Sequence, residues 1–162
     1  LNTVLGEGMS SRLFTEIREK RGLAYSIYSY LSAMHDTGAA GVYAGVDPKR
    51  VKDAIKAILG EWDMLRQESV PADELTKAKE FVKGRLLLQM EDSFSVAAWQ
   101  GRQEVLSSEV LAVDEVVEAL EAVTAADIQR VAQSLFLGER LNLAVVGPFE
   151  EDGEGFGELL KL

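Results

Sequence analysis

The residues best suited to chemistry are an arginine and a tyrosine seven positions apart. Arg18 falls in the last turn of an expected helix, and Tyr25 begins an expected strand after a short turn, so the tips of the two side chains can meet. A guanidinium and a phenol aimed at one point can hold a carbonyl oxygen or an oxyanion without transferring a proton. The alternative is structural, because cations are favoured near a helix C-terminus and tyrosine is common in strands. Spacing by itself favours the structural interpretation.

Other sources of catalysis are scarce in this sequence. The chain has one histidine, His35, and no cysteine, which excludes a thiol nucleophile, a thiolate metal site and a zinc site built from two imidazoles. We expect His35 to be an exposed loop residue. Gly6 and Gly8 have the spacing of a phosphate-binding loop, but no strand precedes them and no Walker lysine follows. Ser10 and Ser11 stand where a helix begins, and we expect them to cap it.

Composition and charge exclude several classes of protein. The 162 residues are 47% hydrophobic and 27% charged, as in one globular domain with a sizeable core. A net charge of -10 argues against binding to nucleic acid or to anionic lipid. No apolar run approaches the roughly 20 residues that a membrane-spanning helix needs. We expect a soluble, cytoplasmic protein, although the absence of cysteine does not separate cytoplasm from periplasm.

The elements that would position Arg18 and Tyr25 are a helix and a hairpin. An amphipathic helix is predicted over 10–20, ending at Gly22, and its apolar face is formed by Leu13, Phe14 and Ile17. The segments 24–34 and 39–46 are rich in aromatic and β-branched residues on either side of a polar turn. They predict an antiparallel β-hairpin.

Helices dominate the rest of the chain. Asp47 and Pro48 are typical of a helix start, with an acidic N-cap and proline at the first position. Apolar spacing predicts helices over 47–65, 71–92, 94–106, 113–120 and 124–136, and a buried closing strand over 141–146. The predicted fold is α+β, with helices packed on one face of an antiparallel sheet.

The two ends of the sequence predict how the domain begins and where a C-terminal tail follows it. The chain begins at Leu1, inside an apolar-spaced segment, so we expect an N-terminally truncated domain that lacks at least one leading strand. We assign residues 1–147 to the domain and 148–162 to an acidic, Gly-rich tail. The tail's apolar residues are expected to dock on the domain or on a neighbouring molecule, and they are Phe156, Leu159, Leu160 and Leu162.

Several motifs together carry a family resemblance. They cover nearly the whole chain up to the tail and comprise Leu5–Ser26, Asp36-Thr37-Gly38, Tyr43-Ala44-Gly45, Lys79–Leu88, Gly101-Arg102-Gln103-Glu104, Val123-Thr124 and Leu143–Pro148. The sequence resembles the second half of the pitrilysin, or insulin-degrading-enzyme, family of zinc metallopeptidases, close to its mitochondrial-processing-peptidase-like bacterial members. This resemblance favours the functional interpretation of Arg18 and Tyr25.

The resemblance implies a metallohydrolase-like half that carries no zinc. The first half of such a protein holds the zinc in a His-x-x-Glu-His motif, and the second half closes over it to make a chamber for peptides. Arg18 and Tyr25 would then be catalytic, by holding the substrate backbone and stabilising the tetrahedral intermediate. Gly6, Gly8 and Arg21 would bind substrate. This chain would supply no metal ligand, its zinc would lie on a partner domain or subunit, and it should be inactive alone.

Two other functions remain open at this point. The chain could belong to a noncatalytic structural or substrate-presenting subunit, related to the core subunits of processing peptidases. It could also be a peptide-binding module that uses the edge of its hairpin for β-augmentation. Because a missing leading strand would expose a sheet edge, we further expect a dimer. The expected partners are the zinc-bearing half and a peptide substrate.

Overall fold

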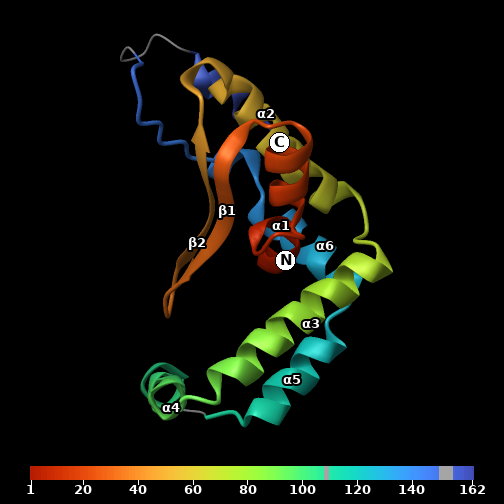
Figure 1. The fold of residues 1–162 in the computed structure, drawn as a ribbon, viewed down its shortest axis with the longest axis vertical. Coiled ribbons are helices and arrows are strands. Elements are labelled where there is room, and N and C mark those ends of the chain that lie inside the picture. The colour runs from red at the N-terminus through yellow and green to blue at the C-terminus, as the bar shows by residue number, and fades with distance from the viewer. Residues whose placement is uncertain (108–109, 150–154) are drawn as a thin grey trace. The chain divides into compact units, whose positions relative to one another are not determined.

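The computed structural model describes residues 1–107, 110–149 and 155–162. The chain divides into two compact units (Figure 1). We call Leu1–Val70 with Ala126–Leu162 the sheet unit and Pro71–Ala125 the helical unit. Arg18, Tyr25 and the other candidate site residues all lie in the sheet unit.

Two helical segments open the sheet unit, α1 (Asn2–Gly6) and η1 (Leu13–Lys20). The helix predicted over 10–20 is found from residue 13 onward, with π-helical rather than α-helical hydrogen bonding. Leu13 and Ile17 are completely buried where η1 contacts the first strand. Gly22 ends the segment with a φ of 55°, and the N–H of Leu23 donates to the carbonyl of Ile17 at 2.8 Å. The predicted stop at Gly22 is confirmed.

The expectation that serines cap this helix is wrong. The N-cap residue of η1 is Arg12, which makes no side-chain capping hydrogen bond. Ser11 is buried, and its hydroxyl donates to the carbonyl of Gly8 at 2.8 Å. A cap must accept a hydrogen bond from a helix N–H, whereas this hydroxyl closes the turn that precedes the helix.

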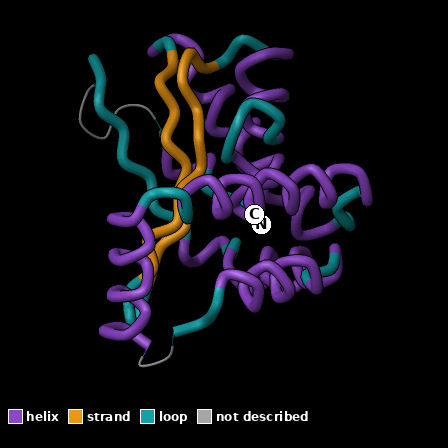
Figure 2. The backbone as a smooth tube through the Cα atoms, turned by 60° about the horizontal axis from the view of Figure 1, so that its bottom comes forward, coloured by secondary structure: helices purple, strands orange, loops and turns teal. Residues whose placement is uncertain are grey.

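The predicted hairpin is confirmed as β1 (Ala24–Ala33) and β2 (Gly38–Val46), which pair in antiparallel register. Figure 2 shows the two strands running side by side. Ile27 and Ser29 are buried on the strand that α1 and η1 contact, while the intervening Tyr28 is exposed. Helices thus cover one face of the hairpin, as an α+β fold requires.

The helix that follows the hairpin begins as predicted. Asp47 Oδ1 accepts the N–H of Lys49 at 2.8 Å, and proline opens the short 3-10 segment η2 (Pro48–Arg50). This segment runs directly into α2 (Val51–Gln67). One stripe of α2 forms a buried apolar cluster of Val51, Ile55 and Leu59.

The C-terminal part of the chain covers that stripe of α2. The apolar side chains packed against it are Leu141, Val145, Phe149, Phe156, Leu159, Leu160 and Leu162. The last four are the tail residues that were expected to dock, and their docking site is found on α2 of the same chain. Phe149, also in the tail, packs there as well. Residues 150–154 lie outside the described part of the chain.

The predicted strand over 141–146 is wrong. This segment has no regular secondary structure, and the described residues form a sheet of two strands, β1 and β2. Leu141 and Val145 pack on α2, whereas Val146 is fully exposed. A strand is defined by backbone hydrogen bonds to a neighbour, so a strand-like sequence without a paired neighbour is left as extended chain.

The helix α6 (Ala125–Leu135), predicted over 124–136, packs against the end of α2. Phe136, just after α6, stacks on Trp62 with ring centroids 4.6 Å apart. The side-chain amides of Gln129 and Gln133 donate to the carbonyl of Arg66 at 3.1 and 2.9 Å. These bonds satisfy a carbonyl in the last turn of α2 that has no partner within its own helix.

The helical unit contains three helices that the apolar spacing predicted: α3 (Ala72–Gln89), α4 (Ser93–Ser107) and α5 (Val113–Ala122). Lys79 Nζ donates to the carbonyl of Glu121 at 2.6 Å, and Lys83 Nζ lies 3.1 Å from its carboxylate. Two lysines one turn apart on α3 thereby hold the end of α5.

Candidate functional site

The structure brings Arg18 and Tyr25 together. Arg18 lies in the last turn of η1 and Tyr25 at the start of β1, and the turn at Gly22 reverses the chain between them. The Cζ atom of Arg18 lies 5.8 Å from the centroid of the Tyr25 ring. It lies closer still, at 4.8 Å, to the centroid of Phe14. Both rings therefore lie within the range of a cation–ring contact with the guanidinium.

Both side chains of the pair are open to solvent. Arg18 is exposed, and Tyr25 is 86% exposed although its neighbour Ala24 is buried. A guanidinium carries five N–H donors and no acceptor, and a phenol adds an O–H donor. The pair therefore suits a ligand with an acceptor oxygen, such as a peptide carbonyl, a carboxylate or an oxyanion.

A β-bulge explains why Tyr25 points outward. Ala24 pairs with Val46 and Ser26 pairs with Gly45, so Tyr25 has no opposite residue in β2. A bulge re-aims the side chain at the irregular position. Beside it lies an open pocket of about 620 Å³, lined by Gly22–Tyr25 and Gly45–Asp47.

The contacts of Arg18 differ from those of its basic neighbour. Lys20 forms an ion pair with Glu16 on the same helix, as a cation on a helix surface commonly does. In the described part of the chain, no carboxylate forms an ion pair with Arg18, whose guanidinium contacts two aromatic rings instead. Arg18 can therefore bind an anionic ligand without first breaking an ion pair, whereas Lys20 is already paired with Glu16.

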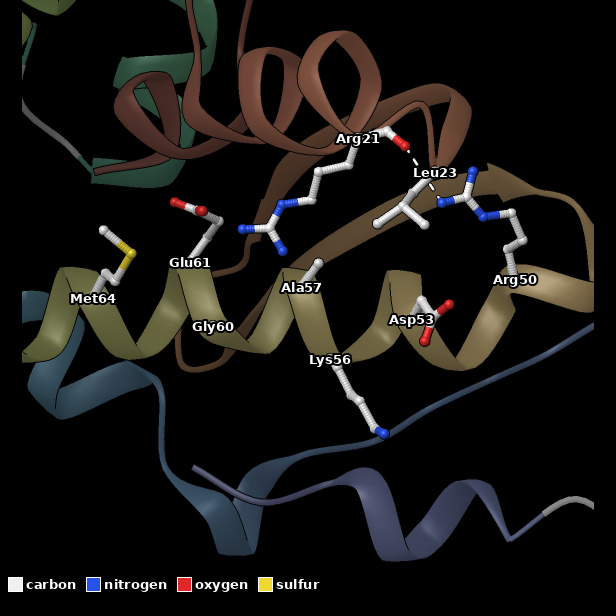
Figure 3. Close-up of a pocket in the computed structure, with 9 residues that line it drawn as sticks. All are labelled: Arg21, Leu23, Arg50, Asp53, Lys56, Ala57, Gly60, Glu61 and Met64. Atoms are coloured by element: carbon white, nitrogen blue, oxygen red, sulfur yellow. Dashed lines mark hydrogen bonds between the residues drawn. The ribbon is translucent and has the colours of Figure 1, made fainter.

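Arg21 lines a second pocket, of about 630 Å³, between the end of η1 and α2 (Figure 3). Arg50 closes one end, where its guanidinium donates to the carbonyls of Gly22 and Arg21 at 3.1 and 3.4 Å. Figure 3 shows the Arg21 side chain reaching along α2 toward Glu61, which is buried. Arg21 and Tyr25 therefore line two different pockets.

The two glycines of the first loop have different surroundings. Gly6 is buried at the end of α1, and a Cβ atom there would lie 2.4 Å from the backbone nitrogen of Ser29. Its missing side chain lets α1 pack closely on β1. Gly8 is exposed with a φ of 89°, and His35 is exposed in the turn of the hairpin.

Neither a metal cluster nor a membrane helix is found in the residues described. Over 1–107, 110–149 and 155–162, no group of three or more His, Cys, Asp and Glu side chains is arranged to hold a metal ion. Within those same ranges, no helix is both long and apolar enough to cross a bilayer.

Comparison with known proteins identifies the family. Residues 1–82, which include η1 and the hairpin, match the model of the peptidase M16 inactive domain. The chain belongs to the peptidase M16 family. A protein of Streptomyces coelicolor described as an uncharacterised zinc protease is 42% identical over 151 residues, which are 93% of this chain and 33% of that protein. This M16 domain thus spans about a third of the length of that relative.

Solved structures carry the same fold. A peptidase M16 inactive domain from Pseudomonas fluorescens superimposes with a TM-score of 0.75 over 83% of this chain and 32% of that chain, at 19% identity. A chain of complex III from Candida albicans gives a TM-score of 0.68 over 77% of this chain and 30% of that chain, at 26% identity. The α+β fold and the assignment to the inactive, C-terminal half of the family are thereby established.

Phe14 is a site residue that the amphipathic pattern does not indicate. The pattern predicts that Phe14 shares the apolar face of the helix with Leu13 and Ile17, yet these two are completely buried while Phe14 is only half-buried. The available signal was its spacing, because an aromatic residue four positions before an arginine on a helix can contact it.

Proposed function

We propose that this M16 inactive domain is the half of a zinc endopeptidase that lacks the metal, closing over a zinc-bearing half and helping to bind the peptide substrate. The observation that supports this proposal is the Arg18–Tyr25 contact, with 5.8 Å between Cζ and the ring centroid. It is an exposed pair of donors in a domain whose relatives are named zinc proteases.

The proposed role of the pair is electrostatic. The Arg18 guanidinium and the Tyr25 hydroxyl donate hydrogen bonds to the carbonyl oxygen of the scissile peptide and hold it as negative charge develops in the tetrahedral intermediate. A guanidinium N–H and a phenol O–H are both hydrogen-bond donors. Neither has to move a proton.

The zinc is proposed to lie outside this chain. The described residues offer no metal-binding group, and one histidine with no cysteine is too few of the usual zinc donors. A catalytic zinc on the partner half would supply a polarised carbonyl and an activated water. The residues of this chain would bind and orient the peptide and stabilise its oxyanion.

Three further residues are proposed to bind the peptide substrate or to shape the loop that binds it. Gly8 exposes its backbone next to η1, and Gly6 sets the course of the loop by fixing α1 on β1. Arg21 brings a positive charge to the pocket between η1 and α2, where an acidic group of a longer peptide could bind.

A second candidate function is that of a noncatalytic subunit. The structural match to a chain of complex III favours it, because that chain carries the same fold as part of a larger complex. In such a subunit Arg18 and Tyr25 would have no substrate to hold. Zinc content and peptide cleavage of the whole protein separate the two functions.

The deciding experiment uses the full-length protein, with its zinc-bearing half present. Cleavage of a mixed peptide library is compared between wild type, Arg18→Ala and Tyr25→Phe, with zinc content and melting temperature recorded for each. Lys20→Ala and Tyr28→Phe are matched controls, since both residues are exposed on the same two elements. We expect turnover to fall about 100-fold or more in each site variant with zinc retained, which is the usual effect of removing an oxyanion donor.

Two results would contradict the proposal. If wild type binds zinc and cleaves peptides but the site variants match the controls, Arg18 and Tyr25 are a helix-end cation and a surface aromatic residue. If wild type neither binds zinc nor cleaves, the noncatalytic subunit is the correct function.

A further inference from the structure

Phe14 lies one helical turn before Arg18 and is its nearer aromatic contact. The Arg18 Cζ atom is 4.8 Å from the Phe14 centroid, against 5.8 Å from that of Tyr25. Attraction between a cation and a ring extends to about 6 Å, so Tyr25 is near that limit and Phe14 is well inside it. Phe14 is therefore the stronger of the two contacts.

The helix that carries Phe14 is anchored in the sheet unit. Its residues Leu13 and Ile17 are completely buried, so they set the direction in which the Phe14 side chain leaves the helix. An arginine side chain is long and flexible, and Arg18 has no carboxylate partner in the described residues to hold it. The half-buried Phe14 ring offers the guanidinium an aromatic face on which it can stack.

We propose that Phe14 is a positioning residue for Arg18. Its ring holds the guanidinium over Tyr25 before substrate arrives, so that the donors of both residues already face one point. The inference rests on the proposed function of Arg18 and adds a residue that acts through Arg18. Pre-organised donors stabilise a developing charge better than donors that must first be ordered.

The test is made in the full-length protein with Phe14→Leu, Phe14→Tyr and the double variant Phe14→Leu/Arg18→Ala. We expect Phe14→Leu to lower kcat about two- to fivefold with little change in KM, which is the effect of losing one cation–ring contact at an exposed site. Phe14→Tyr should match wild type, because it keeps the ring. Added to Arg18→Ala, Phe14→Leu should cause no further loss.

The helical unit offers a matched control. Phe81 and Arg85 have the same four-residue spacing, with Cζ 5.7 Å from the ring centroid, so Phe81→Leu removes a longer arginine–ring contact in the other unit of the chain. Its kcat should equal that of wild type. If Phe14→Leu also equals wild type, or if it lowers kcat equally with and without Arg18, Phe14 does not act through Arg18 and the inference is wrong.

A second measurement separates this inference from the proposed function. With arginine labelled by 15N in the full-length protein, the order parameter of the Arg18 Nε–H bond reports its mobility. Phe14→Leu should lower it and Phe14→Tyr should preserve it, whether or not Arg18→Ala affects cleavage. An unchanged order parameter in Phe14→Leu overturns the inference even where Arg18 proves essential.

Discussion

Close contacts among Asn2, Gly6 and Ser29 hold α1 against β1. Ser29 is buried, and its hydroxyl lies 2.7 Å from Asn2 Oδ1 and 3.1 Å from the Asn2 carbonyl oxygen. Gly6 sits against the same serine with no room for a side chain. Because α1 leads into the loop and helix that carry Arg18, this small cluster holds the starting point of the site.

Gly6→Ala tests whether packing accounts for this glycine. The added methyl group would meet Ser29 backbone nitrogen at 2.4 Å, and overpacking against a fixed backbone costs about 1–3 kcal/mol. Urea unfolding should therefore show a lower free energy of unfolding. Gly60→Ala is the control, because a Cβ there meets open space inside α2, where alanine is favoured by about 0.5–1 kcal/mol. Equal stability of wild type and Gly6→Ala would remove the packing role.

At the scale of elements, the sequence predicted local features well, including the hairpin, but it did not predict pairing between segments that are distant in the chain. The Asp47 cap, the stop at Gly22 and the hairpin follow from residue types within a few positions, and all three are found. The strand over 141–146 has the right residues, but a strand also needs a neighbour, which no local pattern supplies. Its apolar Leu141 and Val145 are instead partly buried against α2.

In the candidate site, too, the sequence predicted what depends on neighbouring residues and missed what depends on distant ones. The seven-residue separation and the turn at Gly22 predicted that Arg18 and Tyr25 could meet, and they do. The bulge that turns Tyr25 outward depends on its register with β2. The contact between Phe14 and Arg18, in contrast, follows from their four-residue spacing on one helix. The register of β1 with β2 does not follow from the spacing of apolar residues.

The contact between α3 and α5 predicts a dependence on pH. The hydrogen bond from Lys83 to Glu121 and the nearby charge of Glu80 raise the pKa of Lys83 above its ordinary value. A lysine whose pKa is higher in the folded than in the unfolded state adds to the stability of the fold at pH values below its unfolded pKa of about 10.4. This added stability is lost as the pH rises through the folded pKa. The helical unit should therefore lose stability above about pH 10.

NMR titration of the Lys83 side chain measures this effect directly. Glu121→Gln should lower the pKa of Lys83 more than Glu80→Gln does, since the Lys83 nitrogen lies 3.1 Å from Glu121 and 3.8 Å from Glu80. Equal shifts in the two variants would show that general charge, rather than the hydrogen bond to α5, sets the pKa.

At the scale of the whole molecule, the hairpin leaves an apolar face uncovered within the sheet unit. Tyr28 and Tyr43 stack across the strands with centroids 5.1 Å apart, and both are about half exposed at 47% and 50%. They line a cleft of about 910 Å³ whose other wall includes Ile58 and Trp62 of α2. In the described residues β2 pairs with β1 alone, so its outer edge keeps unpaired backbone groups.

An open strand edge beside an apolar cleft predicts that residues 1–162, expressed by themselves, associate into dimers or larger species. Sedimentation velocity over a range of concentrations measures this. Tyr43→Lys should shift the distribution toward monomer, because it puts a charge on the uncovered face. Met9→Lys adds the same charge at a 79% exposed residue before η1 and should change little. A monodisperse wild-type monomer at high concentration would show that the uncovered face does not drive association.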